Sequence, residues 1–217
     1  MAVLKMGARS RPAFGLSKND LAALRLRVAA GDDAARLDLV QRLAVAHAPD
    51  ARDEAMRLLS AACERGDADA LMLNATFALR GVGRKQDMDE AFALLAQAAE
   101  CGSSDAQRQM RVLGGKFDRD IWYAPMQLRQ HHAAPRIFTV EKLISPEVCA
   151  WFIEYARARL ERSTVRDGAT GMDVVADGRS ADLAGTTPLQ TDLVLQLTKL
   201  RIAGAIPGVR RVLLSHG

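Results

Sequence analysis

The chain has 217 residues, of which 49% are hydrophobic, 26% charged and 5% aromatic. This length provides for one large domain or two small ones with a packed core. The 16 glycines and 7 prolines are scattered, which excludes collagen-like and low-complexity proteins. The net charge is +4, and residues 1–31 hold six Lys and Arg against a single Asp.

The basic N-terminal residues predict a solvated tail over residues 1–19. They have no aromatic partner beyond Phe14, so we expect no nucleic-acid binding, which combines basic with stacking aromatic side chains. No apolar run approaches the ~18–20 residues that cross a bilayer, and residues 1–11 lack the apolar core of a secretory signal. We therefore expect no membrane association. The three cysteines, Cys63, Cys101 and Cys149, predict small buried thiols in a cytoplasmic protein.

The next stretch repeats itself. Residues of the segment 53–70 recur 36 positions later, because Asp53 matches Asp89 and 89 − 53 = 36. The matching positions are Asp53-Glu54-Ala55, Leu58-Leu59, Ala62, Glu64, Gly66 and Asp69-Ala70. A third, weaker copy of the pattern Gly-Asp-x-x-Ala begins at Gly31-Asp32, one residue out of the 36-residue register. A fixed period of this length indicates stacked supersecondary units.

Each unit has the pattern of two helices joined by a short turn. Ala55, Leu58, Leu59 and Ala62 follow the spacing of one helical face. Gly66 stands where a left-handed residue ends that helix, and Ala70, Leu73 and Phe77 begin the next apolar face. The sequence therefore predicts a repeated α-hairpin, an α/α solenoid, over residues 20–113.

The unit resembles the Sel-1-like repeat, a relative of the tetratricopeptide repeat. The matching residues are Ala70, Leu73, Phe77, Gly81, Gly83, Ala91, Leu94, Ala98-Ala99-Glu100 and Gly102. Asn74 replaces the usual glycine, and Val82 lies between the two glycines instead of after them. The resemblance implies a protein or peptide partner, bound through the helix faces around Leu73 and Phe77. The alternative is a purely structural extension of the next domain.

Residues 114–134 read as an irregular linker, neither helix nor strand, in which Trp122 and Tyr123 hold the chain against the helices. His131-His132 suggests a metal site, because imidazole is a common transition-metal ligand. No carboxylate or cysteine adjoins the pair to complete such a site. A surface or packing role is the expected one.

From residue 135 onward, β-branched residues become frequent and the pattern becomes α+β. Residues 135–140 predict a strand, and Ser145-Pro146-Glu147 predicts a helix start with Ser145 as N-cap. The expected buried face of this helix comprises Val148, Phe152, Ala156 and Leu160, with Cys149 and Ile153 beside them. Residues 163–165 read as extended, residues 168–185 as a loop and 211–214 as a strand. A capping box at residues 187–190 predicts a helix ending near Gly204, with Leu189, Leu193, Leu197 and Leu200 on one face.

This order of elements resembles the N-terminal portion of prolyl 4-hydroxylase-like 2-oxoglutarate/Fe(II) dioxygenases, over residues 135–205. The matching residues are Leu143 to Glu147 with Cys149, Leu160 to Val165, Arg179-Ser180, Asp192-Leu193-Val194 and Arg201-Ile202-Ala203. The resemblance implies a double-stranded β-helix (jelly roll) that uses Fe(II), 2-oxoglutarate and, as a further candidate, ascorbate. It also implies that Arg179 and Ser180 flank a substrate groove, where a plain surface turn is the alternative.

The iron ligands of that family, a His-x-Asp pair and a distant His, are missing from the sequence. Its histidines are His47, His131, His132 and His216, and none is followed two residues later by Asp. We therefore expect no catalytic, cofactor-binding or metal-binding residue in this chain. We expect residues 135–217 to be an incomplete domain, truncated before the metal motif. Since such a domain exposes unpaired strand edges, we also expect proteolysis to remove it first.

Overall fold

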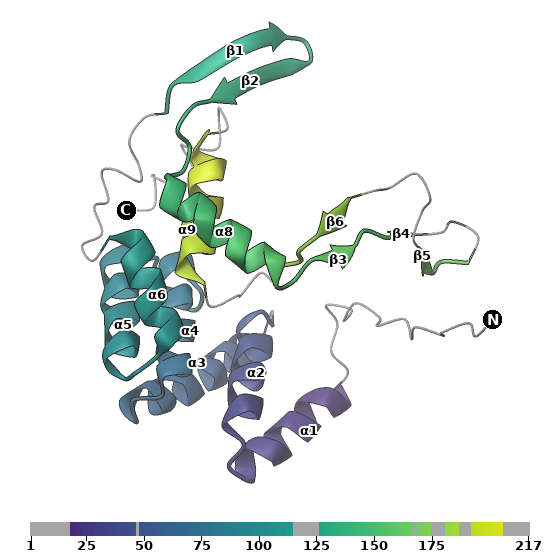
Figure 1. The fold of residues 1–217 in the computed structure, drawn as a ribbon. Coiled ribbons are helices and arrows are strands. Elements are labelled where there is room, and N and C mark those ends of the chain that lie inside the picture. The colour runs from purple at the N-terminus through teal and green to yellow at the C-terminus, as the bar shows by residue number, and fades with distance from the viewer. Residues whose placement is uncertain are drawn as a thin grey trace, which may run out of the picture. The chain divides into compact units, whose positions relative to one another are not determined.

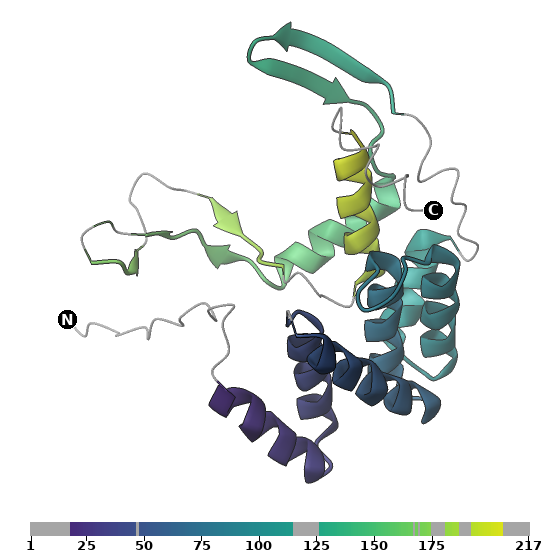
Figure 2. The same cartoon turned by 180° about the vertical axis from the view of Figure 1, so that it is seen from behind.

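A computed structural model describes residues 18–46, 48–114, 126–166, 168, 170–174, 181–186 and 192–205. The described residues are mostly helical, with short antiparallel strand pairs (Figure 1, and from behind in Figure 2). They belong to two compact units. One comprises residues 1–39 and 153–186, and the other comprises residues 40–152 and 187–217. The chain thus leaves the second unit within one helix and later re-enters it.

The first unit contains helix α1 (Lys18–Ala29), the start of α2 (Asp33–Ala44) and an arm of four two-residue strands. In this arm, β3 (Glu161–Arg162) pairs with β6 (Asp182–Leu183), and β4 (Val165–Arg166) pairs with β5 (Asp173–Val174), both antiparallel. The arm is therefore one hairpin nested within another. The prediction of a loop over residues 168–185 was wrong for β5 and β6, because β3 and β4 need partners for their backbone groups.

The second unit is built on the helical array, which we define as helices α3 to α6. The bounds are α3 (Pro49–Glu64), α4 (Ala68–Arg80), α5 (Met88–Glu100) and α6 (Ser104–Leu113). Helix α4 packs on both α3 and α5, and α5 packs on α6. The 36-residue period is confirmed as a structural period, because α3 and α5 end 36 residues apart, as do the starts of α4 and α6 (104 − 68 = 36).

Each turn between paired helices uses the same device. A glycine with positive φ is followed by a polar residue that caps the next helix, as in Gly66 (φ 75°) before Asp67. The Asp67 carboxylate accepts hydrogen bonds from the amides of Asp69 and Ala70, at 3.0 and 3.1 Å. Ser103 and Asp32 occupy the corresponding positions and accept from Ala106 and Ala35. The weaker first copy found in the sequence therefore forms the same kind of turn between α1 and α2.

A β-hairpin follows the array, formed by β1 (Leu128–Ala133) and β2 (Arg136–Val140). Strand β2 was predicted, whereas β1 lies in residues expected to be irregular. The physical reason is that a lone strand leaves its amide and carbonyl groups unpaired, and residues 128–133 supply the partners. The register shifts between Gln130 and His132, which places a bulge at His131.

Helix α8 (Pro146–Arg157) begins as predicted. Ser145 Oγ accepts a hydrogen bond from the Val148 amide at 3.4 Å, and Pro146 is the first helical residue. The predicted buried face was only partly right. Val148 and Trp151 are buried, but Cys149 is exposed, and Ile153 and Leu160 are 57% and 51% exposed. Only Val148 and Trp151, in the first half of the helix, are buried, because their side chains belong to the hydrophobic core shared with the array.

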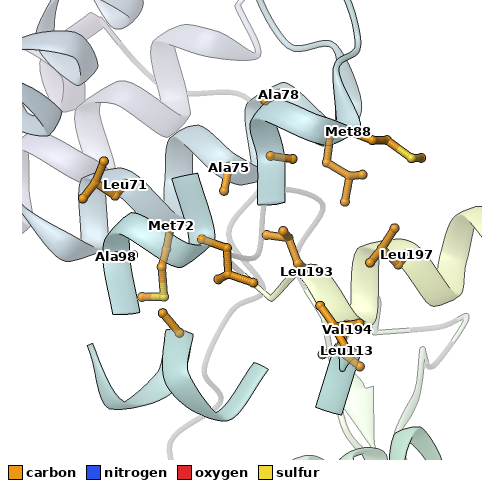
Figure 3. Close-up of a cluster of buried hydrophobic side chains, with 14 of the residues drawn as sticks. Leu71, Met72, Ala75, Ala78, Met88, Ala98, Leu113, Leu193, Val194 and Leu197 are labelled. Carbon is orange, nitrogen blue, oxygen red and sulfur yellow. The ribbon is translucent and has the colours of Figure 1, made fainter. Parts of the chain in front are cut away.

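Helix α9 (Leu193–Ala205) begins at Leu193 and is capped by Asp192, whose Oδ1 accepts from the Leu195 amide at 2.9 Å. The predicted capping box at residues 187–190 lies outside the described residues, as does the predicted strand 211–214. Helix α9 shares one hydrophobic core with α8 and the array, drawn in part in Figure 3. The buried members of this core are Leu71, Met72, Ala75, Ala78, Leu79, Met88, Ala91, Leu95, Ala98, Ala106, Leu113, Val148, Trp151, Leu193, Val194 and Leu197.

Candidate functional site

The most deeply buried polar cluster with long-range hydrogen bonds lies at the N-terminus of α9. We call it the α9 junction and define it as Gln109, Trp151 and Asp192, which come from α6, α8 and the residue before α9. Gln109 Oε1 accepts a hydrogen bond from the Leu193 amide at 2.7 Å. Trp151 Nε1 donates to Asp192 Oδ2 at 3.1 Å. All three side chains are at least nine-tenths buried.

Two cationic side chains, Arg108 and Lys199, interact with members of this junction. The Arg108 guanidinium lies 5.0 Å from the centroid of the Trp151 ring, which is within the range of cation–π attraction. Burial lowers the pKa of Lys199, as does the charge of Arg80, while the Asp192 carboxylate opposes the shift. Burial also lowers the pKa of Arg201, whose guanidinium donates to the carbonyl of Leu143. The hydrogen bond from Arg201 to Leu143 joins the second half of α9 to the segment before α8.

The residues predicted to bind substrate, Arg179 and Ser180, lie outside the described residues. The arm strands nearest to them in sequence are β5 and β6. Where β6 pairs with β3, the Arg162 guanidinium lies 3.6 Å from the Asp182 carboxylate, and the Ser163 amide donates to the Ala181 carbonyl at 3.1 Å.

The two neighbouring histidines lie on β1 and each has a local partner. His131 Nε2 is 2.9 Å from Thr139 Oγ1, and His132 Nδ1 is 3.1 Å from the carbonyl oxygen of Pro135. Within the described ranges, no three His, Cys, Asp or Glu side chains come together as a metal site. These histidines therefore do not fit an iron site that needs two imidazoles and a carboxylate. His47 and His216 lie outside the described residues.

The expectation of three buried thiols was wrong for two of them. Cys101 and Cys149 are exposed, and only Cys63 is partly buried. Burial raises the pKa of the Cys63 thiol. Cys101 follows the last residue of α5 and Cys149 lies on the uncovered side of α8, so helical spacing alone misjudged both. Trp122 and Tyr123 lie outside the described residues.

The helix face proposed for peptide binding is not accessible. Leu73 and Phe77 are fully buried within α4 and belong to the core of the array. Conversely, sequence reasoning missed the α9 junction. Asp192 was part of a recognised motif and Trp151 was on a predicted helix, but nothing in the sequence distinguishes Gln109 from its neighbour Gln107.

Comparisons with known proteins give one partial match. The Arabidopsis thaliana protein named Probable prolyl 4-hydroxylase 7 is 32% identical over 86 residues, which cover 40% of this chain and 26% of that protein. The chain resembles a prolyl 4-hydroxylase over part of its length. It spans about a quarter of the length of that relative. No family model and no solved structure matches.

The helices of the described segments are too short or too polar to cross a membrane.

Proposed function

We propose that residues 135–205 are the N-terminal portion of a prolyl 4-hydroxylase-like 2-oxoglutarate/Fe(II) oxygenase domain, preceded by Sel-1-like helical repeats. The sequence similarity to the Arabidopsis thaliana protein carries this proposal. The contacts support it, because residues that carry the resemblance interact with one another: Arg201 donates to Leu143, and Asp192 caps α9.

No step of the oxygenase reaction is assigned to residues of this chain. In that family, bound Fe(II) would activate O2, which is the oxidant, with 2-oxoglutarate as co-substrate and ascorbate as a further candidate cofactor. The described residues provide no matching set of ligands, and the 217 residues contain no His-x-Asp. We infer that this polypeptide by itself does not turn over 2-oxoglutarate.

Two measurements test these statements separately. The purified chain is incubated with Fe(II), 2-oxoglutarate and ascorbate, and succinate is quantified; we expect none above the rate without protein. Succinate formation that depends on iron and 2-oxoglutarate would contradict the inferred inactivity. For the family assignment, the nucleotide sequence downstream of the Gly217 codon is read in three frames. We expect His-x-Asp and a later His, and their absence from every frame would overturn the assignment.

Partner binding through the array is the alternative function. It remains a proposal, but residues other than those expected from the sequence would have to contact the partner. It cannot use Leu73 and Phe77, which are buried. Helix α9 also packs on α4 and α6 and so occupies part of the array surface. An external protein or peptide would have to bind elsewhere on the array.

A further inference from the structure

Helix α9 packs against the array over a surface made of small and branched side chains. Figure 3 shows Leu193 and Val194 of α9 in one buried cluster with Ala75 of α4 and Leu113 of α6. Ala75 and Leu193 are fully buried, and Leu113 is nearly so. Because alanine adds little bulk to α4, it lets another helix approach closely. The array thus offers α9 a fitted apolar face.

The first two turns of α9 are enclosed on every side. All residues from 192 to 198 are buried, including the polar Gln196 and Thr198. A helix with one exposed face would alternate buried and exposed positions with a period near 3.6 residues. The first amides of such an enclosed helix lie away from water, so each needs an acceptor from the protein.

The array itself supplies one of these acceptors. Asp192 Oδ1 accepts from the Leu195 amide, as an ordinary N-cap does. The Leu193 amide lies outside the reach of that cap and donates instead to Gln109 Oε1, from α6. Since this hydrogen bond joins the array to the first residue of α9, it fixes where along α6 the docked helix begins.

We propose that the face formed by α4 and α6 is the built-in docking site for α9 of the same chain, and that Gln109 is its positioning residue. The array then functions as an internal scaffold. It holds α9 in the second unit, to which the chain returns after residues 153–186. The inference rests on the proposed function only in treating α9 as part of the oxygenase-like segment.

Amide hydrogen exchange of the 217-residue chain tests this docking. Gln109→Met keeps the length and packing of the side chain but removes the acceptor. We expect the amides of α9 to exchange at least about tenfold faster, as the loss of one buried acceptor implies, with α3 little changed. Gln107→Met is the matched control, because Gln107 is exposed on the same helix and bonds only the Ala99 carbonyl there. It should leave α9 unchanged.

A second variant keeps the test decisive if Gln109→Met does not fold. Asp192→Asn has nearly the same size and retains one acceptor, but its amide nitrogen cannot accept from Trp151 Nε1. Asp192→Asn is introduced into the Trp122→Phe variant, so that Trp151 gives the single indole N–H resonance in the NMR spectrum. Compared with Trp122→Phe alone, we expect this resonance to shift and the amides of α9 to exchange faster.

Unchanged exchange of α9 in the folded variants, or equal acceleration in every helix, would overturn the proposal. Neither readout depends on turnover, so failure of the oxygenase assignment would leave this result intact.

Discussion

At the scale of single residues, short polar side chains decide where the helices begin. Asp32, Asp67, Ser103, Ser145 and Asp192 each accept a hydrogen bond from an amide in the first turn of the helix that follows. Such a cap contributes about 1 kcal/mol, because it satisfies a donor that has no partner within the helix. Asp32, Asp67 and Ser103 each follow a glycine with positive φ. In these three turns the glycine reverses the chain after one helix, and the next residue caps the following helix.

The capping carboxylate of Asp32 gives a pH prediction. Its hydrogen bond from the Ala35 amide and its pairing with Arg27, at 2.7 Å, lower its pKa. A lowered folded-state pKa means that the contribution to stability is present above the ordinary carboxyl pKa and is lost as pH falls through the folded value. We expect an NMR titration of the Asp32 carboxyl carbon to give a midpoint below that of an unstructured Asp. A midpoint at or above that reference would show that the pairing does not persist in solution.

The cysteines give a second prediction at this scale. Iodoacetamide at pH 8 should label Cys101 and Cys149 well before Cys63, because these two are exposed while burial raises the pKa of Cys63 and leaves less thiolate. Mass spectrometry of peptides taken over a time course measures the order. In urea the three rates should converge. Early labelling of Cys63 under native conditions would be inconsistent with the packing of α3 on α4.

At the scale of elements, the 36-residue period of the helices could be predicted from the sequence. Which elements pack against each helix could not. Leu58, Leu59 and Ala62 predicted a helical face because their spacing is a property of one helix. The exposure of Ile153 and Leu160 depends on what packs against α8, which a single helix pattern does not contain. Strand β1 was missed for a similar reason, since Gln130 and His132 have no strand pattern of their own and pair only because β2 lies opposite.

Helix α4 is the central element of the array, and Phe77 tests this. Phe77 is fully buried, so Phe77→Ala should reduce the free energy of unfolding by about 3–5 kcal/mol through lost burial and a residual cavity. Phe77→Leu, which leaves a smaller cavity, should have a clearly smaller effect. Urea unfolding followed by circular dichroism gives both values. A loss below about 1 kcal/mol for Phe77→Ala would mean that this face of α4 is accessible after all.

At the scale of the whole molecule, a hydrophobic core joins the two regions that the sequence divides into a repeat domain and a later domain. Residues of α8 and α9 share one core with the array, so part of the segment 135–217 is anchored to residues before 114. The described residues of the arm contribute nothing to this core. Leu160, Met172 and Leu183, on or beside the arm, are all at least two-fifths exposed. Stability should therefore differ between the arm and α9, although both belong to the same predicted domain.

Limited proteolysis distinguishes these parts. Apart from the predicted basic tail, trypsin should cleave first at exposed arginines on or beside the arm, such as Arg159 and Arg162. This agrees with the expectation that the C-terminal segment is less resistant than the helical repeats. After that cut, the fragment that contains α9 should still co-elute with the array in native gel filtration and separate in urea. Immediate separation without urea would show that the shared core does not hold α9.

The hydrogen bond between Leu193 and Gln109 joins residues 84 positions apart. Closing a loop of that length costs about 4 kcal/mol of chain entropy, and contacts so distant in sequence slow folding. During synthesis at roughly 5–20 residues per second, Leu193 follows Gln109 by about 4–17 s. For that interval the array leaves the ribosome without α9, so the apolar side chains that contact α9 in the folded protein are exposed to water.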